Sequence, residues 1–180
     1  SPYAISKVAF EMHLAVMHRI HGFPANVIRP SNAYCPGQQL HRIIPKAILC
    51  ALGGTKLKLQ GGGKAEKSYL HGTDLSRAIM TVIEKGEFGS IYNVGPDAPI
   101  SIRALVHGVA AATGVPYDDF VEEAPDRIGQ DSRYWLDSSR IKTLGWMQQI
   151  GIVPGLGEMV RWVKKYPKLL TADTTVKVRP

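Results

Sequence analysis

Strand-like segments alternate with helix-like segments along this chain, and this alternation limits the fold more than any other feature. The strand-like segments are short apolar or alternating runs, and the helix-like segments carry apolar residues at helical spacing. Gly or Pro closes most segments. The predicted strands are 25–29, 56–60, 67–71 and 91–94, and the predicted helices are 3–21, 43–52, 73–85, 101–113, 138–144 and 156–165. Such alternation predicts an α/β fold with parallel strands, too few here to stand alone.

Turn and cap signals lie between these segments. The glycines of residues 61–64 predict a turn, so strands 56–60 and 67–71 could form a hairpin-like unit. Thr73 and Asp74 are typical of a helix N-cap, and we expect Asp74 to serve there. Residues 31–38 are predicted to form a loop at the carboxyl end of strand 25–29. In open α/β sheets, ligands bind at that end of the strands.

The first helix has an unusual distribution of apolar residues. It is predicted to run from Tyr3 to His21 and to end at Gly22. Its apolar residues go nearly all round the helix, so burial of one face would leave others exposed. We therefore expect two buried sides, one against its own sheet and one against a partner subunit or another part of the protein. A homodimer formed through this helix is the expected arrangement.

The start of this helix carries a Tyr and a Lys at a chemically useful spacing. Tyr3 and Lys7 are four residues apart and therefore share one helix face. A Lys ammonium beside a phenol favours the phenolate. Such a phenol can exchange a proton with a sugar hydroxyl near neutral pH. The spacing alone also occurs by chance on surface helices.

Two glycine clusters invite nucleotide-binding interpretations that their neighbours do not support. Residues 61–64 lack the first glycine and the final Ser or Thr of a phosphate-binding loop, because Lys58 and Ala65 stand there. Gly155 and Gly157 lack the third glycine of a dinucleotide fingerprint, and no buried strand leads into them. We interpret both as turn residues, so no dinucleotide-pyrophosphate site is found in these residues.

Charge and composition narrow the class of partner. The 180 residues have a formal net charge of +7 and a hydrophobic content of 44%, as in a globular protein with an ordinary core. No basic run with interleaved aromatic residues is present, so an anionic small molecule is favoured over nucleic acid as the partner. Cys35 and Cys50 have no disulfide or metal-site spacing. No membrane span, signal peptide or metal site is predicted, and a cytoplasmic location is expected.

Several motifs together resemble the extended short-chain dehydrogenase/reductases, the NAD-dependent nucleotide-sugar epimerases and dehydratases. The pattern of residues 126–146 is closest to that of dTDP-glucose 4,6-dehydratases. The resemblance covers Ser1 to about Lys165, with Cys35, Ile128 and Gln130 replacing the usual Gly, Pro and His. The matching segments are SPYAISK (1–7), RPSNAYCPGQ (29–38), KSYLHGTDLSRA (67–78), YNVG (92–95), DRIGQDSRY (126–134) and DSSRIKTLGW (137–146).

The resemblance implies a role for individual residues. Tyr3 would act as the base on the sugar 4-hydroxyl and Lys7 would hold the nicotinamide ribose, with NAD as the cofactor. Pro30 and Ser31 would lie near the nicotinamide. The substrate, a nucleotide-diphosphate sugar, would be bound by Asn32, Lys67, Asn93, Arg127 and Gln130. We predict that Asn32, Lys67 and Arg127 converge on its diphosphate.

Alternatives for these residues come from their ordinary structural roles. Asn32 could tie its own loop in an Asx-turn. Asn93 could satisfy backbone groups, and Lys67 and Arg127 could be solvated surface charges. His71 is assigned no role, because a His in this setting is more often packed or exposed than catalytic.

The resemblance also implies a domain organisation and an activity for the protein. Residues 1–30 would end a Rossmann-like cofactor domain, 31–168 would be mainly a small substrate-binding α/β region with returns to the sheet, and 169–180 would be a tail. The expected function is a nucleotide-sugar 4,6-dehydratase, a lyase of carbohydrate biosynthesis that oxidises C4 transiently. A 4-epimerase, a decarboxylase and a non-enzymatic binding module remain alternatives. We expect a truncated chain, because the family helix lies near mid-chain, and no turnover by these residues alone.

Overall fold

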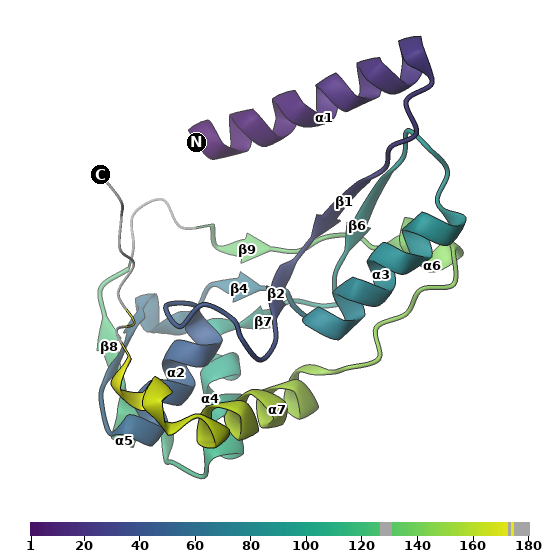
Figure 1. Cartoon of the computed structure of the whole chain (residues 1–180). Helices are drawn as coiled ribbons and strands as arrows, with labels where there is room; N and C mark the ends of the chain where they lie inside the picture. The colour runs from purple at the N-terminus through teal and green to yellow at the C-terminus, as the bar shows by residue number, and fades with distance from the viewer. Residues whose placement is uncertain (127–130, 173, 175–180) are drawn as a thin grey trace.

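The computed structural model describes residues 1–126, 131–172 and 174, and within them it is an α/β protein (Figure 1). The strands are β1 (Val27–Pro30), β2 (Asn32–Tyr34), β3 (Leu57–Gln60), β4 (Glu66–Lys67), β5 (Tyr69–His71), β6 (Ile91–Val94), β7 (Ile100–Ser101), β8 (Val121–Ala124) and β9 (Arg133–Tyr134). The helices are α1 (Pro2–His21), α2 (Ile43–Gly53), α3 (Gly72–Lys85), α4 (Ile102–Thr113), α5 (Tyr117–Phe120), α6 (Ser139–Thr143) and α7 (Ile152–Lys165). Two 3₁₀ turns, η1 (Gly61–Gly63) and η2 (Pro167–Thr171), complete the described elements.

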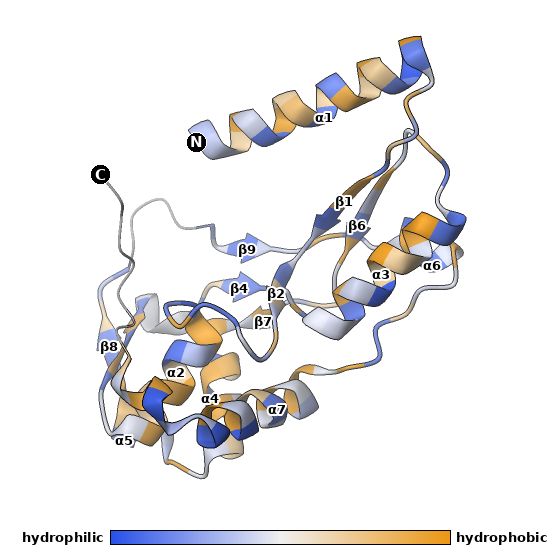
Figure 2. Ribbon diagram, viewed as in Figure 1, coloured by the Kyte–Doolittle hydropathy of each residue, from blue (hydrophilic) through white to orange (hydrophobic). Residues whose placement is uncertain are grey.

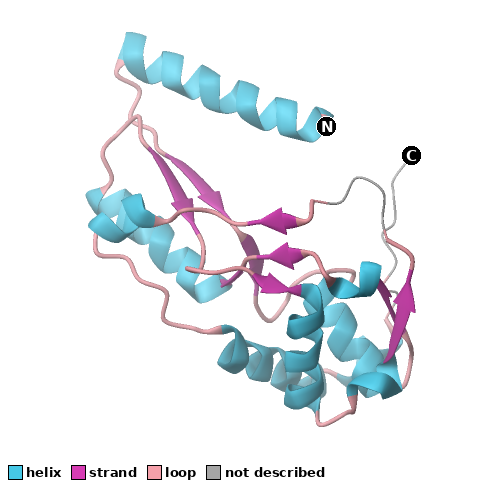
Figure 3. Cartoon of the chain, turned by 180° about the vertical axis from the view of Figure 1, so that it is seen from behind, coloured by secondary structure: helices cyan, strands magenta, loops and turns pink. Residues whose placement is uncertain are grey.

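Parallel strand pairs organise the structure. β1 pairs with β6, from Val27 opposite Ile91 to Pro30 opposite Val94. β2 pairs with β5 and β3 pairs with β8, again in parallel. Helix α1 lies along one side of the β1–β6 pair and α3 along the other (Figures 1 and 3). The β1–β6 pair therefore lies between α1 and α3.

Two apolar cores hold the chain together. The larger core packs α2, α4 and α7 against β3 and α5, with Ile48, Val106 and Met159 fully buried. The smaller core packs α3 and α6 against β6, around Ala78, Val94 and Ile141. Each helix places its apolar stripe on its core, as amphipathic spacing predicts. His71 and Tyr34 lie where β2 and β5 join the two cores.

The expected hairpin between 56–60 and 67–71 is wrong. Gly61, Gly62 and Gly63 have φ values of 57°, 60° and 69°, a left-handed run that suits only glycine. This run turns the chain away, so that β3 pairs with β8 instead. The segment 67–71 is also two strands, because the buried Ser68 interrupts it and its Oγ donates to the Tyr134 carbonyl at 3.3 Å.

Other element boundaries differ from the expectations. The predicted loop 31–38 contains β2, which gains backbone partners only because β5 lies beside it. Helix α7 begins at Ile152 rather than at residue 156, with Gly151 in an extended conformation before it. The short elements α5, β8 and β9 are not predicted, because runs of two to four residues have no detectable periodicity.

The cap of α3 is His71 and not Thr73 or Asp74. The helix begins at Gly72, and the His71 Nδ1 accepts a hydrogen bond from the Thr73 N–H at 3.3 Å. Asp74 lies in the first turn, where it is fully buried and accepts hydrogen bonds from the N–H groups of Gln149 and Ile150. The carboxylate therefore fixes the segment that leads into α7.

Helix α1 is not buried on two sides by the described residues. None of its residues is buried, and several large apolar side chains are more than half exposed. Figure 2 shows apolar residues along the whole of this separate helix. The reason is that the described chain supplies only the β1–β6 pair as a packing surface. No helix in the described part of the chain is long and apolar enough to span a membrane.

Candidate active site

The Tyr3–Lys7 pair is formed in the structure. Ser1 caps α1 by accepting a hydrogen bond from the Ala4 N–H at 3.3 Å, and Pro2 occupies the first turn, where its missing N–H has no cost. The Lys7 Nζ lies 5.4 Å from the centre of the Tyr3 ring, close enough for a cation–π contact. The Tyr3 side chain is exposed in this chain, so its phenol can be reached.

Helix α1 runs antiparallel to β1, so its N-terminal turn lies toward the carboxyl ends of β1 and β6 (Figure 1). There the Ser31 N–H donates to the Val94 carbonyl at 2.8 Å, which joins the two strand ends. The Ser31 Oγ and the Asn93 Oδ1 are buried and have no hydrogen-bond partner among the described residues. Pro30 is exposed beside them. Buried polar atoms without a partner are costly, and a ligand at the strand ends would satisfy them.

Asn32 and Lys67 lie on adjoining segments. The Asn32 N–H and Nδ2 both donate to the Ser68 carbonyl, at 3.1 and 3.2 Å, and Ser68 follows Lys67 directly. The Asn32 side chain therefore bonds a neighbouring segment and does not form an Asx-turn with its own loop. Asn32 is exposed, so its amide is accessible at this position.

Lys67 contacts Asp131, which comes directly after residues 127–130 in the sequence. Its Nζ donates to the Asp131 carbonyl at 2.9 Å. Arg127 and Gln130 themselves lie outside the described residues, so the predicted convergence of Asn32, Lys67 and Arg127 stays a prediction. Asp131 follows them directly, and Asp126 before them approaches Gly61.

Three polar side chains that the sequence analysis did not bring together meet between β2, β5 and α7: Tyr34, His71 and Glu158. The Tyr34 and His71 rings meet edge-on with centroids 5.3 Å apart, and the His71 Nε2 is 3.4 Å from the Glu158 Oε2. The Tyr34 ring also packs against Gly155 so closely that an added Cβ would lie 2.9 Å from its carbons. Burial, with the charges of Asp74 and Glu158, raises the pKa of Tyr34, which keeps this phenol protonated. Tyr34 is therefore unsuited to act as a base.

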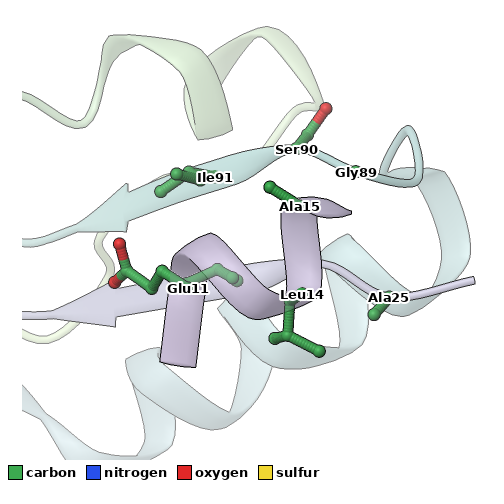
Figure 4. A pocket seen from close by; sticks show the side chains of 8 residues that line it. Glu11, Leu14, Ala15, Ala25, Gly89, Ser90 and Ile91 are labelled. Carbon is green, nitrogen blue, oxygen red and sulfur yellow. The ribbon is translucent and has the colours of Figure 1, made fainter. Parts of the chain in front are cut away.

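Two cavities in the described part of the chain are lined by residues other than the predicted site residues. A cavity of about 300 Å³ is lined by Tyr69, Pro96, Asp97, Ala98, Ile100, Gln148, Gly151 and Ile152, none of them a predicted site residue. A void of about 30 Å³ lies beneath α1 (Figure 4). Among the described residues, no group of three or more His, Cys, Asp or Glu could hold a metal ion. Cys35 and Cys50 are free thiols.

Comparisons with known proteins agree on the family. A model of the NAD dependent epimerase/dehydratase family matches residues 1–95. The dTDP-glucose 4,6-dehydratase of Streptomyces griseus is 35% identical over 167 residues, which cover 92% of this chain and 51% of the relative. The chain spans between a quarter and about half the length of the curated relatives that it matches.

Two solved structures resemble the chain closely. The dTDP-glucose 4,6-dehydratase of Bacillus anthracis, in complex with NAD, has a TM-score of 0.86 and 32% identity, covering 93% of this chain and 53% of that one. The UDP-glucose 4-epimerase of Thermotoga maritima, with UDP-glucose, has a TM-score of 0.86 and 27% identity, covering 92% of this chain and 54% of that one. The fold predicted from the motifs is thereby confirmed.

Proposed function

Because this chain belongs to the NAD dependent epimerase/dehydratase family, we propose that it carries the proton-transferring pair and the substrate-binding part of a nucleotide-sugar 4,6-dehydratase. The Tyr3–Lys7 contact on a helix antiparallel to β1 is the observation that carries the proposal. We assign residues 1–30 to the end of a cofactor domain, 31–168 mainly to substrate binding and 169–180 to a tail. Free thiols suit the cytoplasm, where we place the protein.

The residues at the strand ends fit the nicotinamide end of NAD. Ser31 follows Pro30 there, and its unpartnered Oγ is a polar group that a ligand could satisfy. When bound, NAD supplies an acceptor for the hydride from the sugar C4. Tyr3 takes the proton of the 4-hydroxyl on its phenolate oxygen, and Lys7 stabilises that phenolate and binds the nicotinamide ribose.

Substrate binding is assigned to residues around β2 and β4. Asn32 and Lys67, which adjoin through Ser68, bind the diphosphate together with Arg127, by charge-assisted hydrogen bonds. Asn93 and Gln130 contact the nucleotide or its phosphates. The similarity to dTDP-glucose 4,6-dehydratases supports a nucleotide-diphosphate glucose as the substrate class.

A 4-epimerase of the same family is the second candidate. It is favoured by the structural likeness to a UDP-glucose 4-epimerase, with the same TM-score of 0.86. Both reactions begin with oxidation at C4, so the Tyr3–Lys7 pair serves either. The higher identity to dehydratases favours the first candidate.

Product analysis of the full-length gene product tests the proposal. Incubation with NAD and dTDP-glucose or UDP-glucose is expected to give a 4-keto-6-deoxy sugar, identified by NMR and mass spectrometry as a loss of water. A galactose nucleotide of unchanged mass would establish the epimerase instead. No conversion of either sugar, by a folded protein, would contradict both candidates.

The exposed side of α1 supports a homodimer. Ile5, Met12, Val16 and Ile20 recur at spacings of seven, four and four residues, and their side chains are between 43% and 70% exposed. Such a stripe is typical of helices that pack against another helix. We propose that α1 packs on the α1 of a second copy.

Replacing Met12 and Val16 together with Glu is expected to convert a dimer into a monomer, because two carboxylates from each copy would be buried in the interface. Sedimentation equilibrium at micromolar concentration measures this. The matched control is Ile83→Glu on α3, where the side chain is 68% exposed, close to the 66% of Met12. A wild-type protein that is monomeric at these concentrations would refute the dimer.

A further inference from the structure

An ion pair joins α1 to the carboxyl-terminal part of β1. The Arg29 Nε donates to the Glu11 Oε1 at 2.9 Å, and the Arg29 Nη2 donates to the Glu11 Oε2. Arg29 thus binds both oxygens of one carboxylate, and this bidentate geometry fixes the orientation of the two side chains as well as the distance between them. The Glu11 side chain is 18% exposed and that of Arg29 is 45% exposed. The hydrogen bond from Arg29 lowers the pKa of the Glu11 carboxyl, so the pair is charged at neutral pH.

Glu11 shares a helix face with the proposed catalytic pair. Tyr3, Lys7 and Glu11 follow one another at intervals of four residues, which places them in one row along α1. The direction in which Glu11 points therefore determines the direction in which Tyr3 and Lys7 point. Arg29 in turn directly precedes Pro30 and Ser31, and it lies opposite Asn93 in the β1–β6 register.

The rest of the α1 contact lies on the C-terminal side of this pair. Leu14 and Ala15 of α1 line the small void together with Val27 and Ile91 of the strand pair, and Figure 4 shows this void from close by. His18 packs against Gly89 so closely that a Cβ there would overlap its ring. Among the hydrogen bonds and ion pairs of the described residues, none joins residues 2–10 to another element. The Glu11–Arg29 pair is thus the last such link before the N-terminal turns.

We propose that Glu11 and Arg29 are positioning residues, which aim Tyr3 and Lys7 at the carboxyl ends of β1 and β6. This inference rests on the proposed function of the Tyr3–Lys7 pair. Tyr3 lies eight residues, or about 12 Å, along the helix from Glu11. A tilt of about 10° at Glu11 would therefore move Tyr3 by about 2 Å, and a misplacement of about 1 Å can reduce a catalytic rate by about 100-fold.

A charge-swap experiment on the full-length gene product tests this role. Glu11→Gln keeps the size of the side chain and removes its charge, and Arg29→Gln removes the guanidinium charge and shortens the side chain. The double variant Glu11→Arg with Arg29→Glu restores the pair with its polarity reversed. The control is Glu123→Gln, because Glu123 pairs with Arg103, whose side chain is also 45% exposed. Formation of the 4-keto product gives kcat and KM, and hydrogen–deuterium exchange of residues 2–10 reports on the helix directly.

The expected result is a split between kcat and KM. Each single variant should lower kcat about tenfold or more with the nucleotide-sugar KM within about twofold of wild type, since the substrate residues lie on other elements. The swap should recover kcat to within about threefold, and Glu123→Gln should leave it unchanged. Unchanged kcat in the single variants, or a swap no better than they are, would overturn the inference.

Hydrogen exchange separates this inference from the proposed function. Both single variants should exchange residues 2–10 faster than the wild type, and the swap should restore protection. If the wild-type protein converts no nucleotide sugar, the proposed function fails, and the exchange data alone decide the positioning role. Exchange that is equal in the wild type and in Glu11→Gln would refute it.

Discussion

Replacing Tyr3 with Phe should reduce the kcat of the full-length gene product by about 10²–10⁴-fold, the usual contribution of a positioned proton-transfer group. The change removes only the phenol oxygen and keeps the ring that the Lys7 ammonium contacts at 5.4 Å. Tyr3 is exposed in this chain, so its loss should leave the folding stability nearly unchanged. Steady-state formation of the 4-keto product measures the effect.

Tyr166→Phe is the matched control for this variant. Tyr166 also has a neighbouring Lys ammonium, with the Lys165 Nζ 5.8 Å from its ring centre, but it lies beyond the end of α7. The kcat of the Tyr166→Phe variant should equal that of the wild type. A Tyr3→Phe enzyme that retains more than about a tenth of the wild-type kcat would remove Tyr3 from the role of base.

Local signals predicted most of the helices. The first helix ends at Gly22, whose φ of 62° is the left-handed conformation expected of a C-cap glycine. The predicted helix 101–113 is α4, and Ser101 is its N-cap, because its Oγ accepts a hydrogen bond from the Ala104 N–H. Strand partners were harder, since pairing depends on which distant segment lies alongside. The β3–β8 pair joins residues more than 60 positions apart and has no signature in either segment.

In the candidate site, too, contacts within one helix could be predicted from the sequence, whereas contacts between elements could not. The Tyr3–Lys7 contact follows from a spacing of four on one helix. The Glu11–Arg29 pair joins two elements, so their face-to-face placement becomes visible only in the fold. His71 was given no role from the sequence, yet its ring caps α3 and touches Tyr34. Its register position opposite Tyr34 creates that contact.

Asp74 illustrates how a misassigned residue can have a large effect on stability. A cap at a solvent-exposed helix end would contribute about 1 kcal/mol. The structure instead buries the carboxylate completely and surrounds it with donors from Arg77, Gln149 and Ile150. The Asp74 carbonyl also accepts a hydrogen bond from the Trp146 Nε1 at 3.1 Å, on the same segment. One residue thus joins α3 to the chain that enters α7.

Asp74→Ala is therefore expected to lower the free energy of unfolding by about 3 kcal/mol, because it leaves the half-buried Arg77 charge without its carboxylate partner and the N–H groups of Gln149 and Ile150 without their acceptor. Asp74→Asn keeps one acceptor oxygen but turns an NH₂ group toward donors, so a loss of about 1–3 kcal/mol is expected. Urea unfolding followed by tryptophan fluorescence measures both changes. The control is Asp97→Ala, which breaks the exposed pair with Lys142 and should cost less than about 1 kcal/mol. Equal losses for Asp74→Ala and Asp97→Ala would mean that the buried carboxylate does not hold the two segments together.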